Sequence, residues 1–145
     1  MVSVEIIYDV DGLTDTLDDT QLKLYASELL ARSGIKNGSI NIIFVSNSSM
    51  TELNEKYKKG VGSTDVLTFN LSDSEEILEG EIYISPEKAT EQAEEFKVSV
   101  DEELIRLATH GLLHLAGYLH NDDESYREMM QLTDTFVAEY FSKGV

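Results

Sequence analysis

The segment from Ser99 to Gly117 constrains the fold of this chain more than any other. Apolar residues recur in it every three or four positions, as on the buried face of a helix: Leu104, Ile105, Leu107, Ala108, Leu112 and Leu115. Ser99 and Glu102 have the spacing of a capping box, and a glycine commonly ends a helix. The sequence therefore predicts a core helix that ends at Gly117, with the other elements packed around it.

Strand-like and helix-like patterns alternate over the rest of the chain. β-Branched and apolar runs predict strands at residues 2–10, 39–45, 65–71 and 81–85. Helical spacing, caps and glycine stops predict helices within residues 17–34, from Ser49 through Tyr57, at residues 87–96 and after Asn121. This order predicts an α/β (α+β) fold, in which a small mixed sheet of about four strands is surrounded by helices. The length fits a single domain over residues 1–145.

The composition excludes several classes of function. Asp and Glu number 28 against 11 Lys and Arg, which gives a formal net charge of −17. Broad binding to duplex nucleic acid needs a cationic face and is therefore not expected. The absence of cysteine excludes disulfides and thiolate metal sites. No apolar stretch reaches the roughly 20 residues that cross a bilayer, and the first residues lack the basic start of a signal peptide. We expect a cytoplasmic protein that has no membrane partner.

All three histidines lie close together, at His110, His114 and His120. The first two are one helical turn apart, so both imidazoles leave the same face of the core helix. Gly117 permits the left-handed backbone that turns the chain back, which would let His120 reach the same point. Three neutral imidazoles with one open position form a catalytic zinc site, whose bound water is the fourth ligand. The pattern predicts one zinc ion per chain, with another divalent transition metal as an alternative.

Two other interpretations of the histidines exist. They could be core-facing and loop residues without a metal, or they could hold a structural zinc with a fourth ligand from Asp122 or Asp123. These two aspartates are better explained as N-cap residues of the last helix.

The histidine spacing equals that of the metzincin peptidases, whose pattern is H-E-x-x-H-x-x-G-x-x-H. A peptidase needs the glutamate of this pattern as its general base. Here Gly111 stands at that position. Glu102 and Glu103 lie about two turns away along the helix and are not expected to replace the base. The sequence therefore argues against proteolysis.

A second candidate region is the densest cluster of positive charge, formed by Lys56, Lys58 and Lys59. These lysines could bind phosphate groups, or they could be a solvated helix end, where cations are favoured by the helix dipole. Thr64 and Asp65 follow at the start of a predicted strand, where turn and cap residues are more common than site residues.

Together the two regions resemble the YbeY family of bacterial rRNA maturation factors, which are metal-dependent endoribonucleases. The family's H-G-x-L-H-L-x-G-Y-D-H run is matched by residues 110–120. Its upstream run of Asn, Tyr-Arg and Thr-Asp-Val-Leu-Ser-Phe is matched by Asn54, Tyr57, Lys58 and residues 64–69. Gly80-Glu81-Ile82 resembles the family's Gly-Asp-Ile strand, so the resemblance covers essentially the whole chain.

The resemblance implies that His110, His114 and His120 bind one zinc ion in a cleft beside the strand that begins at Thr64 and Asp65. It also implies cleavage of single-stranded RNA, processing of small-subunit rRNA, and contact with the ribosome or a ribosomal protein. In this interpretation Lys58 and His110 act in catalysis, and Lys58, Thr64 and Asp65 contact the RNA.

The chain departs from the family's pattern at two positions. Lys58 replaces an arginine, which keeps the charge but loses the bidentate fork. Leu119 replaces an aspartate, which removes a side chain able to orient a metal ligand. Two further functions therefore remain as alternatives: a zinc hydrolase acting on another substrate, and a non-catalytic ribosome-assembly factor with a structural metal.

Overall fold

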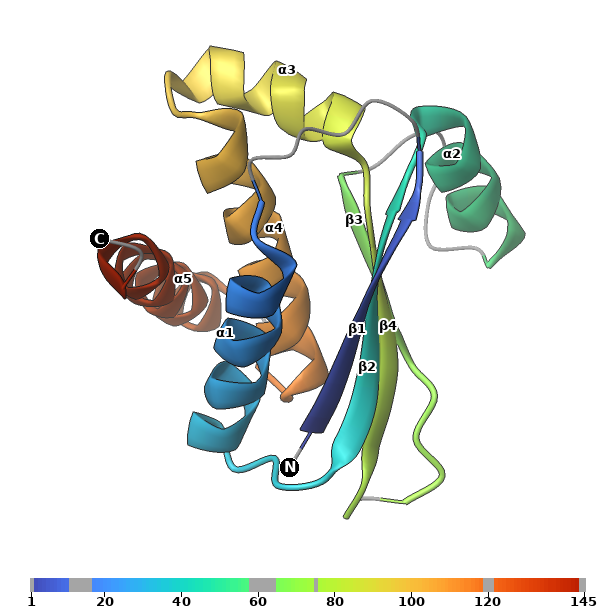
Figure 1. The fold of residues 1–145 in the computed structure, drawn as a ribbon, viewed down its shortest axis with the longest axis vertical. Coiled ribbons are helices and arrows are strands. Elements are labelled where there is room, and N and C mark those ends of the chain that lie inside the picture. The colour runs from blue at the N-terminus through green and yellow to red at the C-terminus, as the bar shows by residue number, and fades with distance from the viewer. Residues whose placement is uncertain (1, 11–16, 58–64, 75, 119–121, 144–145) are drawn as a thin grey trace.

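The structure is a computed structural model that describes residues 2–10, 17–57, 65–74, 76–118 and 122–143. Within these ranges it contains four strands and five helices (Figure 1). The strands are β1 (Val2–Asp9), β2 (Gly38–Val45), β3 (Val66–Asn70) and β4 (Leu78–Ile84). The helices are α1 (Asp19–Arg32), α2 (Asn47–Lys56), α3 (Pro86–Phe96), α4 (Val100–Leu115) and α5 (Asp123–Lys143).

The strands form one mixed sheet in the order β1-β2-β4-β3. β1 pairs with β2 and β2 with β4 in parallel, while β3 is an antiparallel edge strand against β4. The register aligns Ile6, Ile42, Ile82 and Thr68 in one row across the sheet. The predicted α/β fold with a small mixed sheet is therefore confirmed.

The helices are divided unequally between the two faces of the sheet (Figure 1). α1 and α4 cover one face, and α5 packs against them on the side away from the sheet. The main core lies between the sheet and these helices, where Leu22, Leu29, Ile42, Ile82 and Leu112 are at most 1% exposed. α2 lies on the other face, above a smaller cluster of Ile43, Val45, Met50 and Leu67.

The ends of α4 have the predicted cap chemistry. The Ser99 hydroxyl accepts a hydrogen bond from the Glu102 amide at 3.0 Å, which satisfies one of the first amides of the helix. At the other end Gly117 has φ of +105°. Its amide donates to the His114 carbonyl and the Tyr118 amide donates to the Leu113 carbonyl, each at 3.0 Å, as in a Schellman motif. The core helix thus begins and ends where the sequence predicts.

The start of α2 differs from the prediction. Ser49 was expected to cap this helix, but the N-cap is Ser46, whose side chain accepts from the Ser49 amide at 3.2 Å. The helix therefore begins at Asn47. Both serines can form the same cap hydrogen bond, so local sequence does not distinguish them.

Gly111 sets how closely α4 approaches the sheet. It is buried, and a Cβ at this position would lie 2.7 Å from Cγ2 of Ile82 and 3.2 Å from Cγ2 of Thr68. Both distances are shorter than an ordinary van der Waals contact. The position at which a metzincin has its glutamate base therefore faces the packed sheet, where no larger side chain fits.

Replacing Gly111 with alanine is expected to destabilise the protein. The added Cβ overpacks a buried contact at a cost of about 1–3 kcal/mol, which exceeds a helix-propensity gain of about 1 kcal/mol. Thermal unfolding should give a lower Tm for Gly111→Ala than for the unmodified protein. Adding Ile82→Ala, which removes the opposing methyl groups, should cost less than the sum of the two single changes. Additive losses, or a higher Tm for Gly111→Ala, would contradict this packing.

Candidate active site

His110 and His114 lie together on one face of α4. Their ring centroids are 5.0 Å apart, with 63° between the ring planes, and both side chains are partly exposed. The pair therefore has the shared face that the spacing predicts. His120 lies outside the described residues, and so does Leu119.

The donor set fits a divalent transition metal as far as the structure describes it. Two imidazoles one turn apart supply nitrogen ligands of the kind that zinc prefers. Partial exposure leaves them accessible to an ion, and the chain turns back at Gly117, directly after this pair. Among the described residues no group of three or more His, Asp or Glu side chains forms a complete site. The predicted third ligand, His120, belongs to the part that is not described.

A pocket of about 290 Å³ lies beside His110, between α3, α4, α5 and the start of β3, and we call it the α3–α5 pocket. Its lining includes Asp65, Gln92, Phe96, Glu103, His110 and Tyr126. The Gln92 amide donates a hydrogen bond to Oδ2 of Asp65 at 3.2 Å and so fixes that carboxylate. The structure thus brings Asp65 and His110, which are distant in sequence, to one cavity.

Glu103 is a residue of this pocket that the sequence interpretation missed. It was set aside because it lies about two turns before the histidines, yet a separation of seven residues returns a side chain to the same helix face. Its side chain is only 3% exposed. Burial raises the pKa of the Glu103 carboxyl, the Arg106 guanidinium opposes this, and the charges of Asp65 and Glu102 raise the pKa further. The separation of seven residues from His110 was the sequence feature that could have placed Glu103 on the histidine face of the helix.

Arg106 is the cation of the α3–α5 pocket, and two carboxylates already engage it. Its Nη1 atom lies 2.5 Å from Oδ1 of Asp134, and its Nη2 atom lies 3.9 Å from Oε2 of Glu102. The guanidinium therefore bridges α4 and α5 at the edge of the pocket. Because its charge is shared between two partners, it is a poor candidate for binding a phosphate.

The predicted basic cluster is described only in part. Lys58, Lys59 and Thr64 lie outside the described residues. Lys56 ends α2, and its Nζ atom lies 5.5 Å from the centre of the Tyr57 ring. Lys56 lines a different pocket, formed with Tyr83 on the α2 face of the sheet. The structure therefore separates Lys56 from the α3–α5 pocket.

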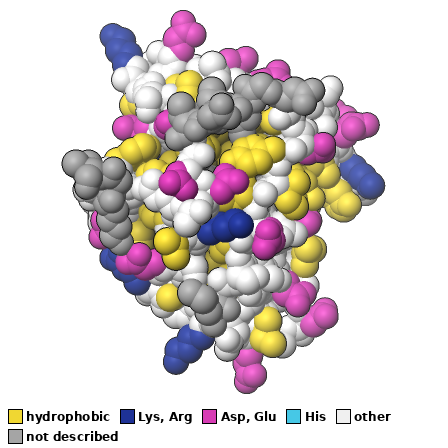
Figure 2. All heavy atoms as spheres, viewed as in Figure 1, with side chains coloured by type: hydrophobic (Ala, Val, Ile, Leu, Met, Phe, Trp, Pro, Cys, Tyr) yellow, Lys and Arg dark blue, Asp and Glu magenta, His cyan; other side chains and the backbone are white. Residues whose placement is uncertain are grey.

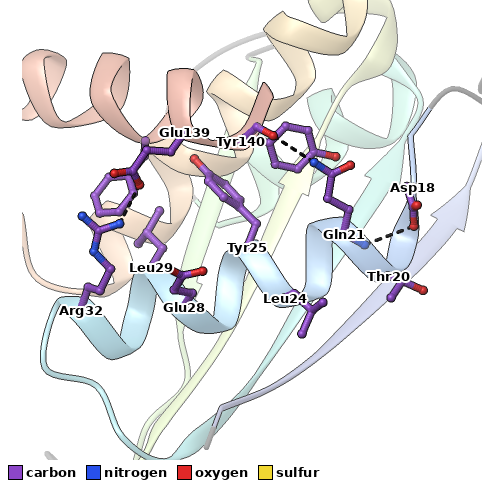
Figure 3. A pocket seen from close by; sticks show the side chains of 11 residues that line it. Asp18, Thr20, Gln21, Leu24, Tyr25, Glu28, Leu29, Arg32, Glu139 and Tyr140 are labelled. Carbon is purple, nitrogen blue, oxygen red and sulfur yellow. Dashed lines mark hydrogen bonds and ion pairs between the residues drawn. The ribbon is translucent and has the colours of Figure 1, made fainter. Parts of the chain in front are cut away.

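A larger groove of about 380 Å³ lies between α1 and α5 (Figure 3). Its described walls are mostly apolar and include one cation, Arg32. The Nη1 atom of Arg32 lies 2.6 Å from Oε2 of Glu139, and its Cζ atom lies 4.7 Å from the centre of the Phe136 ring. The Gln21 amide donates to the Tyr140 carbonyl and links the two helices. None of the described residues that line this groove is a histidine, so they include no metal ligand of the expected kind.

The alternative fourth metal ligand, Asp122, has another role. Its Oδ1 atom accepts a hydrogen bond from the Ser125 amide at 2.7 Å. Hydrogen bonds from Ser125 hold the pKa of the Asp122 carboxyl below its usual value. The interpretation as an N-cap of α5 is confirmed for this residue.

Comparison with known proteins identifies the family. A family model described as endoribonuclease YbeY matches residues 11–141. The chain belongs to the YbeY family. The endoribonuclease YbeY of Treponema denticola is 32% identical over 132 residues, which cover 86% of this chain and 85% of that protein. The endoribonuclease YbeY of Thermotoga petrophila is 36% identical over 131 residues, covering 90% and 84%.

The fold also matches that of a solved structure. A solution structure of a Thermotoga maritima protein superposes with a TM-score of 0.67 at 32% identity, covering 97% of this chain and 90% of that one. Membership of the YbeY family confirms the predicted resemblance and the prediction of an endoribonuclease, because the relatives are named endoribonucleases. Within the described residues, every helix is too short or too polar to cross a bilayer.

The raised pKa of Glu103 predicts a pH-dependent stability effect. The pKa of the Glu103 carboxyl is higher in the folded state than in the unfolded state, so between these two values the folded state binds more protons than the unfolded state. The free energy of unfolding then falls as pH rises through that interval. Glu103→Gln removes the ionisable carboxyl and with it this fall in the free energy of unfolding. The substitution should therefore raise the Tm at about pH 7 and have no such effect at about pH 3.5.

Glu102→Gln is the matched control for this prediction. Glu102 is the adjacent residue, but it is more exposed and lies 3.9 Å from Arg106, so its removal should give no gain in Tm. A Tm of Glu103→Gln equal to that of the unmodified protein at both pH values would contradict the electrostatic account.

Proposed function

We propose that this protein is a zinc-dependent endoribonuclease that cleaves single-stranded RNA in the maturation of small-subunit rRNA. The observation that carries the proposal is the pair His110 and His114 beside the α3–α5 pocket, in a chain of the YbeY family. The named relatives support ribonucleic acid as the substrate. We place the activity in the cytoplasm, in contact with the ribosome or a ribosomal protein.

His110, His114 and His120 would hold the metal in this proposal. A bound zinc ion supplies Lewis-acid polarisation of a phosphoryl oxygen and lowers the pKa of its bound water. The role of His110 in catalysis is to hold this ion, while its neighbours in the α3–α5 pocket bind the RNA strand.

The chain's own side chains would position the RNA around this site. Lys58 neutralises the negative charge that grows on the scissile phosphate as the reaction proceeds. The Thr64 hydroxyl contacts the same phosphate group. Asp65, which Gln92 holds in place, accepts a hydrogen bond from the RNA strand. We assign Lys58 to catalysis and binding, and Thr64 and Asp65 to binding.

The acidity of the protein limits how RNA can approach. Acidic side chains are scattered over the face seen in Figure 2, with few Lys or Arg among them. At physiological salt the Debye length is about 8 Å, so distant carboxylates repel RNA weakly at the site. A basic ribosomal protein would compensate for the remaining charge by binding both the enzyme and the RNA.

A peptidase function is disfavoured by the packing around Gly111. The side chain of a general base at this position would enter the space of Ile82 rather than the side of α4 that carries the histidines. Installing Gly111→Glu is therefore expected to disrupt the core rather than create a protease.

Lys58 offers the sharpest test of the proposed chemistry. Loss of a hydrogen bond to a charged group costs about 1.5–3 kcal/mol, so Lys58→Ala should reduce RNA cleavage by about tenfold to hundredfold. Lys58→Arg should keep or raise the rate, since a guanidinium can bind two phosphate oxygens. Lys56→Ala is the control, because Lys56 lines a pocket on the α2 face. Single-turnover cleavage of a single-stranded RNA measures all three, and equal small effects would remove Lys58 from the active site.

A further inference from the structure

Two aromatic side chains from different helices line the α3–α5 pocket. Phe96 ends α3 and is 61% exposed, and Tyr126 in the first turns of α5 is 52% exposed. Lys97 adopts a left-handed conformation, with φ of 59° and ψ of 43°, and so ends α3 directly after Phe96. Single exposed aromatic residues are common on protein surfaces. Two that line one cavity form a platform for a flat, apolar ligand.

The same pocket also contains polar lining residues. Glu103 is 3% exposed and belongs to the lining of this pocket. A carboxyl group in the lining can form a hydrogen bond with the polar edge of a ligand. Gln92 and Asp65, joined by their hydrogen bond of 3.2 Å, add an amide and a carboxylate to the lining. The site therefore suits a ligand with apolar faces and a polar edge.

A nucleobase has this combination of faces and edge. Unpaired bases of RNA stack on aromatic rings and form hydrogen bonds through their edges. The pocket volume of about 290 Å³ is near the lower limit for small-molecule sites, roughly 300 Å³, which suits one ring system rather than a folded segment. His110 lies in the lining, so a base held here belongs to a nucleotide next to the proposed cleavage site.

We propose that the α3–α5 pocket binds one unpaired base of the RNA strand, between Phe96 and Tyr126 and above Glu103. This inference rests on the proposed function, which it extends by assigning a base-binding subsite beside the histidines. The pocket then explains a requirement for single-stranded RNA, because a base in a duplex is stacked and paired and cannot enter.

The test combines protein variants with RNA that lacks one base. Cleavage of a short single-stranded RNA is mapped, and each nucleotide next to the cut is replaced in turn by an abasic ribose. At one position the missing base should lower kcat/KM by about tenfold, the scale of one base–aromatic stacking contact. Phe96→Ala and Tyr126→Ala should each cause a similar loss on intact RNA and little further loss on that abasic RNA. The proposal would be overturned if the loss caused by a variant multiplied the loss caused by the abasic RNA. It would also be overturned if the variants cut both RNAs as fast as the unmodified protein does.

Phe141→Ala is the matched control. Phe141 is also an exposed aromatic residue of α5, but it lies fifteen residues beyond Tyr126, or roughly 22 Å along the helix. It should leave kcat/KM unchanged on both RNAs. Because Phe96 and Tyr126 are largely exposed, their truncation should preserve the fold, and thermal unfolding of each variant verifies this.

A binding measurement separates this inference from the proposed function. Titration with nucleoside 5′-monophosphates, followed by NMR shifts of the amides of Phe96, Leu107 and Tyr126, requires no cleavage. Shifts at these residues that Tyr126→Ala abolishes support the pocket, and their absence contradicts it. A protein that binds nucleotides here but cuts no RNA would contradict the proposed function and leave the base pocket in place.

Discussion

The close contact of Gly111 with Ile82 is the constraint on which the rest of the site depends. Because a glycine stands there, α4 lies against the sheet with its apolar residues buried between β4 and α1. Successive residues of a helix are about 100° apart around its axis. His110 therefore leaves α4 on a different side from Gly111, and His114 follows it one turn later. One helix thus supplies both the centre of the core and the candidate metal ligands.

The α3–α5 pocket depends on packing beyond α4. α3 and α5 each contact α4, and the pair Arg106–Asp134 connects α4 with α5. This arrangement places a buried carboxyl, two exposed aromatic rings and a histidine around one cavity. Under the proposed function, an RNA strand would gain little from long-range attraction to this acidic protein. Short-range stacking and hydrogen bonding at this cavity would then have a larger share of recognition.

Local patterns were sufficient to predict most of the fold. The α4 segment from Ser99 to Gly117 was predicted with its caps because serine, glycine and apolar spacing act within a few residues. The start of α2 was wrong because Ser46 and Ser49 offer the same cap chemistry. The strand order β1-β2-β4-β3 could not be derived, since it depends on contacts between distant segments. Membership of the YbeY family and the mixed sheet are confirmed; the metal and the roles of individual site residues stay predictions.

The candidate site shows the same division between local and tertiary information. The shared face of His110 and His114 follows from helical spacing alone. The approach of Asp65 to His110 was expected only through the family resemblance. The separation of Lys56 from the pocket follows from the tertiary arrangement of the sheet and not from the local sequence. Glu103 was missed because its role depends on α3 and α5 closing a cavity around it.

The central claim is that RNA cleavage and metal binding belong to the same histidine cluster. Zinc content and cleavage of a single-stranded RNA should be measured on the same preparations of the unmodified protein and of His110→Ala/His114→Ala, before and after a chelator and after zinc is returned. The account predicts about one zinc per chain, loss of zinc and cleavage together on chelation, and recovery of both only in the unmodified protein. RNA cleavage that survives complete removal of the metal, or full zinc retention by the double variant, would contradict it.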